Sequence, residues 1–466
     1  MKELGRSASI GVALSALVAG CQADCPVIPP PAPVATLTVT PAPVASMTTT
    51  PAPAPATPAA TEAVLAVVTV TNAAAAPHPH ETISLSEADL KKIAPTLELA
   101  RTFVTDRKGA PVLSQVVAGA NGGPGELVFQ TDLGPSESQD FSLRAGERKL
   151  APTSAYKVYG RFVRERHDDF AWENDLVAHR MYGPELETTK KEPLVSSGID
   201  VWAKKVPRLL VNEWYLTDDY HQDHGDGADF YSVGKTRGCG GLGIWANEKL
   251  FVSRNFSATR VLANGPIRLV FELDYAAWDA GGSKVSETKR VTLDAGSYFN
   301  RFESTFKTNK NPLAVALGIA KHAGGIVTAD AATASMRVWE PAEKGNGNLA
   351  CAVVLAPGSS GIEKQADDNF LFVTSAKSNE PLRYYVGSAW DRAGHVPTAD
   401  AWGEEVKKLA ARNAAAPHVT VVAGPAVSAP VASVTPSASF PVSPTPASAA
   451  PVAKPAAPAA SPVAPH

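Results

Sequence analysis

Between residues 156 and 388 the chain is divided into short segments rich in β-branched and aromatic residues, often separated by Gly, Asn, Asp or Pro. Several segments alternate in polarity, as strands with one buried face do. Strands that follow one another at this spacing pair antiparallel, which predicts a mainly β fold, a large antiparallel β-sandwich. The expected strands are Tyr156–Val163, Ile267–Tyr275, Lys284–Leu293, Tyr298–Thr308, Leu313–Ala320, Arg337–Glu340, Ala350–Leu355, Phe370–Ser375 and Arg383–Ser388.

Two peripheral helices are expected beside these strands. Ser86–Ile93 starts at a serine that suits a helix N-cap. Thr398–Arg412 starts at a threonine and places Trp402, Val406 and Leu409 on one stripe. The second helix is expected to close the domain against a sheet.

Both ends of the chain are too rich in proline and alanine to form a packed core. A ten-residue pattern, PAPVATLTVT at 31–40, recurs as PAPVASMTTT at 41–50. Proline at this frequency removes backbone donors and favours extended polyproline II. We therefore expect a tether over 21–80, a folded domain over 81–416 and a disordered tail over 417–466, with both ends dispensable for folding.

The first twenty residues have the pattern of an export signal. A basic start is followed by an apolar stretch at 8–19 and by the small residues VAG before Cys21. This pattern predicts a bacterial lipoprotein signal peptide over 1–20, cleaved before Cys21, which then carries the lipid. Gln22 favours the outer membrane, facing the periplasm or the cell surface. An ordinary secretory signal is the alternative.

Charge and cysteine content narrow the possible partners. The formal net charge is only −3 and the sequence has no basic block, which argues against a nucleic-acid partner. After the signal, no apolar run reaches the length of a membrane helix. Cys239 and Cys351 can pair in an oxidising compartment or remain as buried thiols.

The run from Trp214 to Trp245 is the densest group of functional side chains. It holds two histidines, five aspartates, several aromatic residues, an arginine and a glycine-rich end. Charges at this density are not buried unless they are paired, so we interpret the run as the wall of a polar cleft. The expected catalytic residues are Tyr220, His221, His224 and Arg237, with Trp214 and Asp229 in substrate binding.

Three chemistries fit this run. A histidine or tyrosine can remove a proton from a uronate while Arg237 neutralises its carboxylate. Alternatively, Asp223, Asp226 and Asp229 can hold Ca²⁺, although no EF-hand order is present. Thirdly, two carboxylates can act as acid and base on a glycosidic bond. A structured surface loop remains the non-functional interpretation.

A second group of candidates lies around residue 172. Trp172 offers a flat platform for a sugar, and Glu173 and Arg180 can bind its hydroxyl or carboxylate groups. Strand alternation places His179 on the face opposite Arg180. The alternative is a core tryptophan with hydrogen-bonded polar neighbours. The glycines at 238–243 are interpreted as a tight turn and not as a phosphate loop, because no helix follows.

Several long motifs, in the same order, resemble the DUF4861 family of uncharacterised secreted bacterial proteins. They are FAWENDLVAHRMYGP at 170–184, GIDVW at 198–202, the run at 220–241, and NGPIR at 264–268 through LDAG at 293–296. The resemblance covers most of 85–410. It implies a fold similar to the galactose-mutarotase-like supersandwich and, because such sequences often accompany polysaccharide-degrading enzymes, a saccharide partner.

These observations favour a lipid-anchored carbohydrate-active protein of the cell envelope. An enzyme acting on uronate-containing oligosaccharides, as a lyase, hydrolase or epimerase, is preferred because titratable groups cluster with aromatic residues. A non-catalytic carbohydrate-binding lipoprotein and a structural envelope protein are the alternatives.

The lipoprotein signal leads to a direct prediction. We expect the mature protein to partition with membranes through Cys21, and Cys21→Ser to release it into the soluble fraction, as measured by fractionation and immunoblotting. A Cys21→Ser variant that stays membrane-bound would contradict the signal assignment.

Overall fold

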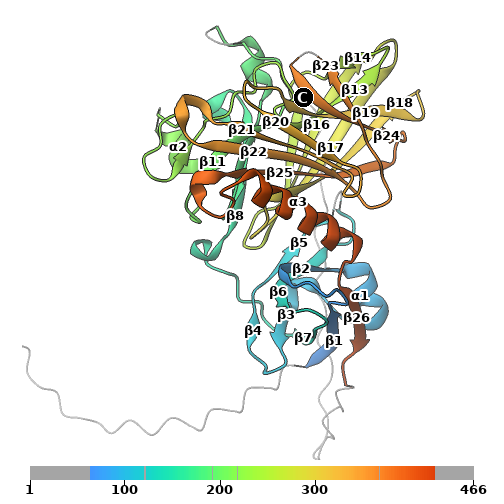
Figure 1. Cartoon of the computed structure of the whole chain (residues 1–466). Helices are drawn as coiled ribbons and strands as arrows, with labels where there is room; N and C mark the ends of the chain where they lie inside the picture. The colour runs from blue at the N-terminus through green and yellow to red at the C-terminus, as the bar shows by residue number, and fades with distance from the viewer. Residues whose placement is uncertain (1–62, 120–121, 191–192, 218, 367, 426–466) are drawn as a thin grey trace, which may run out of the picture. The chain divides into compact units, whose positions relative to one another are not determined.

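The computed structural model describes residues 63–425, except 120–121, 191–192, 218 and 367 (Figure 1). The expected signal peptide, Cys21 and most of both proline-rich ends lie outside these residues. Within the described part, no helix is long and apolar enough to span a membrane. The fold is mainly β, as predicted, and every pair of strands that the structure describes is antiparallel in its named sheet.

A small N-terminal module contains two sheets and one helix, α1 (Glu87–Ile93). Its core is apolar and includes Val68, Val70, Leu127 and Phe129. The first sheet has the order β26 (His418–Ala423), β1 (Val64–Thr71), β7 (Ser138–Ala145), β3 (Thr102–Asp106) and β4 (Pro111–Val112). The second has the order β2 (His78–Ser86), β6 (Glu126–Leu133) and β5 (Ser114–Val117).

This module extends beyond the expected 81–416 boundaries at both ends. β1 and β26 pair with each other, Val68 opposite Val421, although they are more than 340 residues apart in the chain. The composition of the proline-rich ends hides both strands, but the alternation in VLAVVTVT places Ala66, Val68 and Val70 in the core, each 0% exposed. The folded part is therefore longer than expected, and the apolar core of this module is separate from the largest core of the chain.

The large module packs an eight-stranded sheet against two five-stranded sheets. One core unites all three, with Phe170 stacked on Phe271 at 4.1 Å between ring centroids. The eight-stranded sheet has the order β15 (Ala258–Ala263), β16 (Arg268–Asp279), β17 (Lys284–Asp294), β18 (Phe299–Thr308), β25 (Pro381–Trp390), β22 (Asn348–Leu355), β21 (Ser335–Pro341) and β20 (Ile326–Asp330).

The two smaller sheets carry most of the candidate site. One has the order β12 (Gly227–Ala228), β11 (Asp200–Lys204), β10 (Ala178–Met181), β9 (Asp169–Asn174) and β8 (Val158–Val163). The other has the order β14 (Lys249–Phe251), β13 (Cys239–Ala246), β19 (Leu313–Ala320), β24 (Asn369–Ala376) and β23 (Ile362–Ala366). All nine expected strands are present, within a few residues at each end. The galactose-mutarotase likeness stays a prediction.

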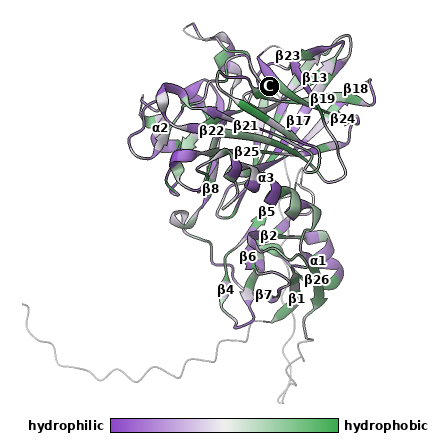
Figure 2. Ribbon diagram, in the orientation of Figure 1, coloured by the Kyte–Doolittle hydropathy of each residue, from purple (hydrophilic) through white to green (hydrophobic). Residues whose placement is uncertain are grey.

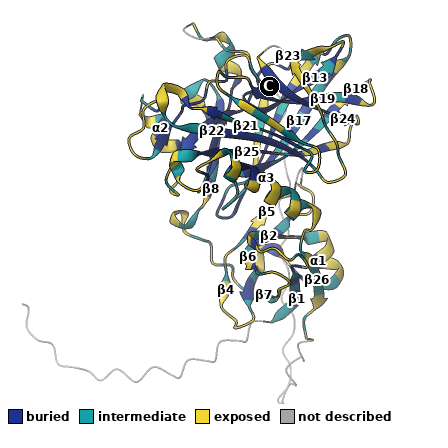
Figure 3. Ribbon diagram, viewed as in Figure 1, coloured by how far each residue is buried: buried dark blue, intermediate teal, exposed yellow. Residues whose placement is uncertain are grey.

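Both expected helices form, and one further helix, α2 (Val211–Leu216), was not predicted. The expected C-terminal helix is α3 (Ala399–Ala414), and the Thr398 side chain caps it by accepting from the Ala401 amide at 3.1 Å. Trp402 and Val406 are buried against β22 of the large sheet. Figures 2 and 3 show how apolar, buried strands lie beneath the more polar, exposed side of α3.

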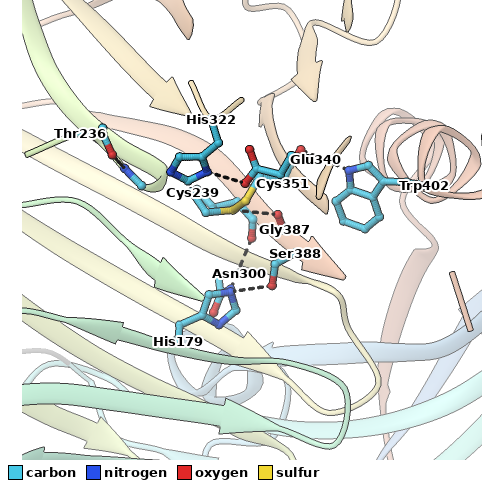
Figure 4. The surroundings of a disulfide bond; sticks show 12 residues. His179, Thr236, Cys239, Asn300, His322, Glu340, Cys351, Gly387, Ser388 and Trp402 are labelled. Atoms are coloured by element: carbon cyan, nitrogen blue, oxygen red, sulfur yellow. Dashed lines mark hydrogen bonds and ion pairs between the residues drawn. A yellow bond between two sulfur atoms is a disulfide. The ribbon is translucent and has the colours of Figure 1, made fainter. Parts of the chain in front are cut away.

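A disulfide joins Cys239 of β13 to Cys351 of β22, so it links a small sheet to the large one (Figure 4). The bridge closes a separation of 112 residues. A loop of this length gives a stabilisation of roughly 4–5 kcal/mol in the chain-entropy model. The alternative of two free buried thiols is thereby corrected.

The two end strands lead to a prediction for shortened chains. A chain spanning 63–425 should have a melting temperature within a few degrees of that of the full chain. In a chain spanning 81–416, the N-terminal module should become sensitive to proteolysis. It lacks β1, in which each buried valine contributes about 1.5–3 kcal/mol. Thermal unfolding and limited proteolysis of the two chains measure the difference. Equal resistance of both chains would contradict the role of β1 and β26.

Candidate functional site

A buried arginine lies among three carboxylates from neighbouring strands. Arg180 of β10 pairs across the sheet with Asp200 of β11, and Asp200 Oδ2 accepts hydrogen bonds from Arg180 Nε at 3.0 Å and Nη2 at 2.5 Å. Nη2 also lies 3.4 Å from Asp229 Oδ2, and Nε lies 3.9 Å from Asp169 Oδ2. All four side chains are buried. We call these four residues the Arg180 cluster.

One guanidinium cannot neutralise three carboxylates that are all buried. Burial raises the pKa of Asp169 to about 7, against the opposing effect of Arg180. Burial also raises the pKa of Asp200, and it raises the pKa of Asp229 well above the ordinary value. A carboxyl group with a pKa of about 7, as at Asp169, can hold or release a proton near neutral pH, which is what a general acid requires.

Aromatic rings enclose the Arg180 cluster. The guanidinium carbon of Arg180 lies 5.2 Å from the Tyr182 ring centre and 5.4 Å from that of Trp202. Tyr220 stacks on Trp202 with 5.1 Å between centroids, and Trp214 packs against the same indole at 5.2 Å. The structure therefore brings the predicted Arg180, Asp229, Tyr220 and Trp214 together around Trp202, a residue that the sequence did not single out.

His221 is the exposed member of this group. Its side chain is 53% exposed, and its Nδ1 lies 3.2 Å from the Asp229 carbonyl oxygen and 3.7 Å from Asp229 Oδ2. The Nδ1 hydrogen is donated to the carbonyl oxygen, which leaves Nε2 unprotonated and able to accept a proton. This geometry suits a general base.

The rest of the predicted run forms a surface loop. His224 is 68% exposed, and its Nε2 lies 3.1 Å from Asp219 Oδ2. Asp223 Oδ1 accepts the amides of Gly225 and Gly227, as a turn-forming aspartate does. Asp226 pairs with Arg208. Because these carboxylates have different partners, they do not form a Ca²⁺ cage, and no group of three or more metal-ligating side chains occurs among the described residues.

Arg237 is in the protein core and does not share an open cleft with the two histidines, which corrects that expectation. It is 1% exposed, and its Nη1 donates to Ser197 Oγ at 2.8 Å and to the Leu242 carbonyl at 3.2 Å. A Cβ on Gly318 of β19 would lie 2.4 Å from Arg237 Cγ, so a glycine on the neighbouring strand makes room for the side chain. Burial lowers its pKa to about 10.

Trp172 and Glu173 are also core residues, both 0% exposed, and cannot present a surface to a sugar. Trp172 Nε1 donates to Asn300 Oδ1 at 2.8 Å, and its ring stacks on His179, whose pKa burial lowers to about 3. Glu173 accepts from Lys204 Nζ at 2.6 Å and from two backbone amides at the start of α2. The sugar-platform interpretation is corrected, because both faces of β9 are buried.

Arg166 is a candidate that sequence reasoning missed. Its guanidinium carbon lies 5.2 Å from the Tyr220 ring centre. It also lines a cavity of about 520 Å³ together with His167, Glu185 and Lys190. The charged stretch RERHDD at 164–169, directly before β9, was the available signal. A cavity with basic residues and one carboxylate in its lining thus shares Arg166 with the Tyr220 side of the site.

His322 forms a second, partly buried pair with Glu340 (Figure 4). His322 Nδ1 lies 3.1 Å from Glu340 Oε1, and Nε2 lies 2.7 Å from the Ser232 carbonyl oxygen. Tyr231 packs edge-on against the ring at 5.2 Å. The hydrogen bond to Glu340 raises the pKa of His322. Both ring nitrogens face acceptor oxygens, an arrangement that favours the protonated imidazole and leaves neither nitrogen free for a substrate.

The sequence profile of the family described as "Domain of unknown function (DUF4861)" matches residues 70–419. A protein of Formosa agariphila named Uncharacterized protein P7 is 32% identical over 359 residues, which cover 74% of this chain and 90% of that protein.

Two solved structures from Enterococcus faecalis are similar only in part. One, a protein in glycosyl hydrolase family 38, has a TM-score of 0.42 and 11% identity, covering 78% of this chain and 49% of that one. The other, an alpha-mannosidase of strain V583, has a TM-score of 0.43 and 10% identity, covering 77% and 46%. The chain spans about half the length of these two proteins.

The His322–Glu340 pair predicts a pH-dependent stability. The folded pKa of His322 is raised, so its contribution is complete below its unfolded pKa of about 6.5 and is lost as the pH rises through the folded value. His322→Gln should therefore lower the free energy of unfolding by about 1.5–3 kcal/mol at acidic pH and by less at alkaline pH.

Denaturant unfolding across this pH range measures the effect. His418→Gln, a change of an exposed histidine on β26, is the matched control. A His322→Gln deficit that does not shrink as the pH rises would contradict the ion pair.

Proposed function

The chain belongs to the DUF4861 family, and on this premise we propose that it is a carbohydrate-active enzyme that uses His221 in acid–base chemistry on uronate-containing oligosaccharides. The observation that carries the proposal is the position of His221. A half-exposed imidazole, with one nitrogen fixed by a backbone carbonyl, lies directly above a buried carboxyl with a raised pKa.

This arrangement supports proton transfer in both directions. His221 Nε2 takes the proton next to the uronate carboxylate. The resulting imidazolium keeps its Nδ1 hydrogen on the Asp229 carbonyl oxygen at 3.2 Å, and Asp229 Oδ2 lies 3.7 Å from the same nitrogen. These two oxygens stabilise the positive charge, and the proton taken up on Nε2 is available for return to the product.

Arg166 supports the choice of an acidic saccharide. A guanidinium binds a carboxylate in two-point geometry, and Arg166 lines the adjoining cavity with His167 and Lys190. Tyr220, held by Trp202 on one side and Arg166 on the other, fixes the base of the loop that carries His221. Arg166 replaces Arg237 in the role of the carboxylate-binding cation.

We also propose that the enzyme is exported and anchored through Cys21 in the cell envelope. The Cys239–Cys351 disulfide supports this proposal, because disulfides persist in oxidising compartments outside the bacterial cytoplasm.

His221→Ala tests the proposed base. We expect this change to lower turnover of the active uronate oligosaccharide by about 10²–10⁴-fold, the usual contribution of a general base. Mass spectrometry of the products and the ultraviolet absorbance of an unsaturated uronate would separate hydrolysis from elimination. His418→Ala, an exposed histidine on the N-terminal module, is the control.

The results distinguish the alternatives. Binding of oligosaccharides without turnover by the wild-type protein would make it a non-catalytic carbohydrate-binding protein. If folded His221→Ala protein turned over the substrate at the wild-type rate, the active site would lie elsewhere than beside the Arg180 cluster.

A further inference from the structure

A second cavity lies on the outer face of the eight-stranded sheet, beside the C-terminal half of α3. It measures about 280 Å³. Three arginines and two carboxylates line it: Arg268, Arg301, Arg412, Glu81 and Asp294. None of these residues belongs to the Arg180 cluster or contacts His221, so this cavity is independent of the proposed catalytic site.

Two of the three arginines have firm partners. Arg268 makes a two-point pair with Asp294, at 2.6 Å from Nε to Oδ1 and 2.8 Å from Nη2 to Oδ2. This guanidinium lowers the pKa of the Asp294 carboxyl, against the effect of burial. Arg412 Nη2 lies 2.9 Å from Glu81 Oε2. The two carboxylates of the cavity are therefore already neutralised.

Arg301 is the arginine of this cavity without a close carboxylate partner. Its Nη2 makes only long contacts, 3.5 Å to Thr292 Oγ1 and 3.6 Å to Glu303 Oε2. Glu303 Oε1 already accepts two hydrogen bonds from Arg383, at 3.1 and 2.7 Å. Arg301 Nε is buried and has no hydrogen-bond partner among the described residues. The cavity thus has an excess positive charge at Arg301.

A second donor without a partner lines the same cavity. Asn413 Nδ2 on α3 is also buried and lacks a hydrogen-bond partner within the described part of the chain. Buried donors are almost always satisfied in folded proteins, so these two donors mark a place where an acceptor can bind. The carbonyls at the end of α3 disfavour an anion there, but the guanidinium of Arg301, whose nearest carboxylate oxygen lies at 3.6 Å, opposes these partial charges.

We propose that this cavity binds an oxyanion, the carboxylate or sulfate group of an acidic saccharide, through Arg301 and Asn413. Arg301 Nε and Asn413 Nδ2 donate to the oxyanion, and Arg412 adds positive charge at the rim. Thr292, Arg301 and Tyr385 form a cross-strand row on β17, β18 and β25, so the base of the cavity is a rigid sheet.

Isothermal titration calorimetry with D-glucuronate and with inorganic sulfate tests the proposal on the full-length protein. We expect at least one of these oxyanions to bind with a stoichiometry of one. Arg301→Met should weaken binding at least ten-fold, and Asn413→Ala should weaken it several-fold. Which anion binds separates a uronate from a sulfate ester as the source of the oxyanion.

Two controls keep the result specific. Arg107→Met removes an exposed arginine that pairs with Asp140 on the N-terminal module, and binding should remain unchanged. Arg166→Met removes the cation proposed to bind a uronate at the catalytic site, so binding that persists in this variant belongs to the present cavity, and failure of the catalytic proposal would not affect this result.

Failure of both anions to bind, or wild-type affinity in Arg301→Met, would overturn the proposal. If Arg301→Met does not fold, the affinity of Asn413→Ala decides the question.

Discussion

The burial of Arg180 is the interaction on which the candidate site depends. Its guanidinium is held against Asp200 by two hydrogen bonds and lies within 4 Å of the Asp169 and Asp229 carboxyl groups. Removing one partner of a buried ion pair costs about 3–5 kcal/mol, because the other charge is left without compensation. The cluster therefore joins three strands. It also fixes the backbone of Asp229, whose carbonyl oxygen accepts a hydrogen bond from His221.

The same burial that stabilises the cluster also determines its chemistry. Desolvation raises the pKa values of the three carboxyl groups, while Arg180 limits the change by its positive charge. His221 is half exposed, whereas Tyr220, Trp202 and Trp214 beside it are buried. The enzymatic proposal follows from this arrangement, in which the exposed imidazole of His221 lies next to buried carboxyl groups with raised pKa values.

The residue pattern within each segment predicted the strands well. It could not predict which strand faces are buried by segments distant in the sequence. Leu313–Ala320 was placed correctly because its apolar, β-branched run is a strand signal on its own. Glu173 was misplaced because strand alternation identifies two faces without showing that both are buried. Arg237 was misplaced for a similar reason: the space for it is made by Gly318, eighty-one residues further along the chain. β1 was missed because its composition resembles that of the tether.

The protonation state of the Arg180 cluster tests this account most directly. Carbon-13 NMR of the aspartate carboxyl carbons, followed with pH in the folded protein, reports the titration of Asp169, Asp200 and Asp229. The account predicts that Asp169 titrates at a pKa of about 7 and that the pKa values of Asp200 and Asp229 are raised above the ordinary aspartate value. Titration of all three groups near the ordinary aspartate pKa of about 3.9 would contradict it.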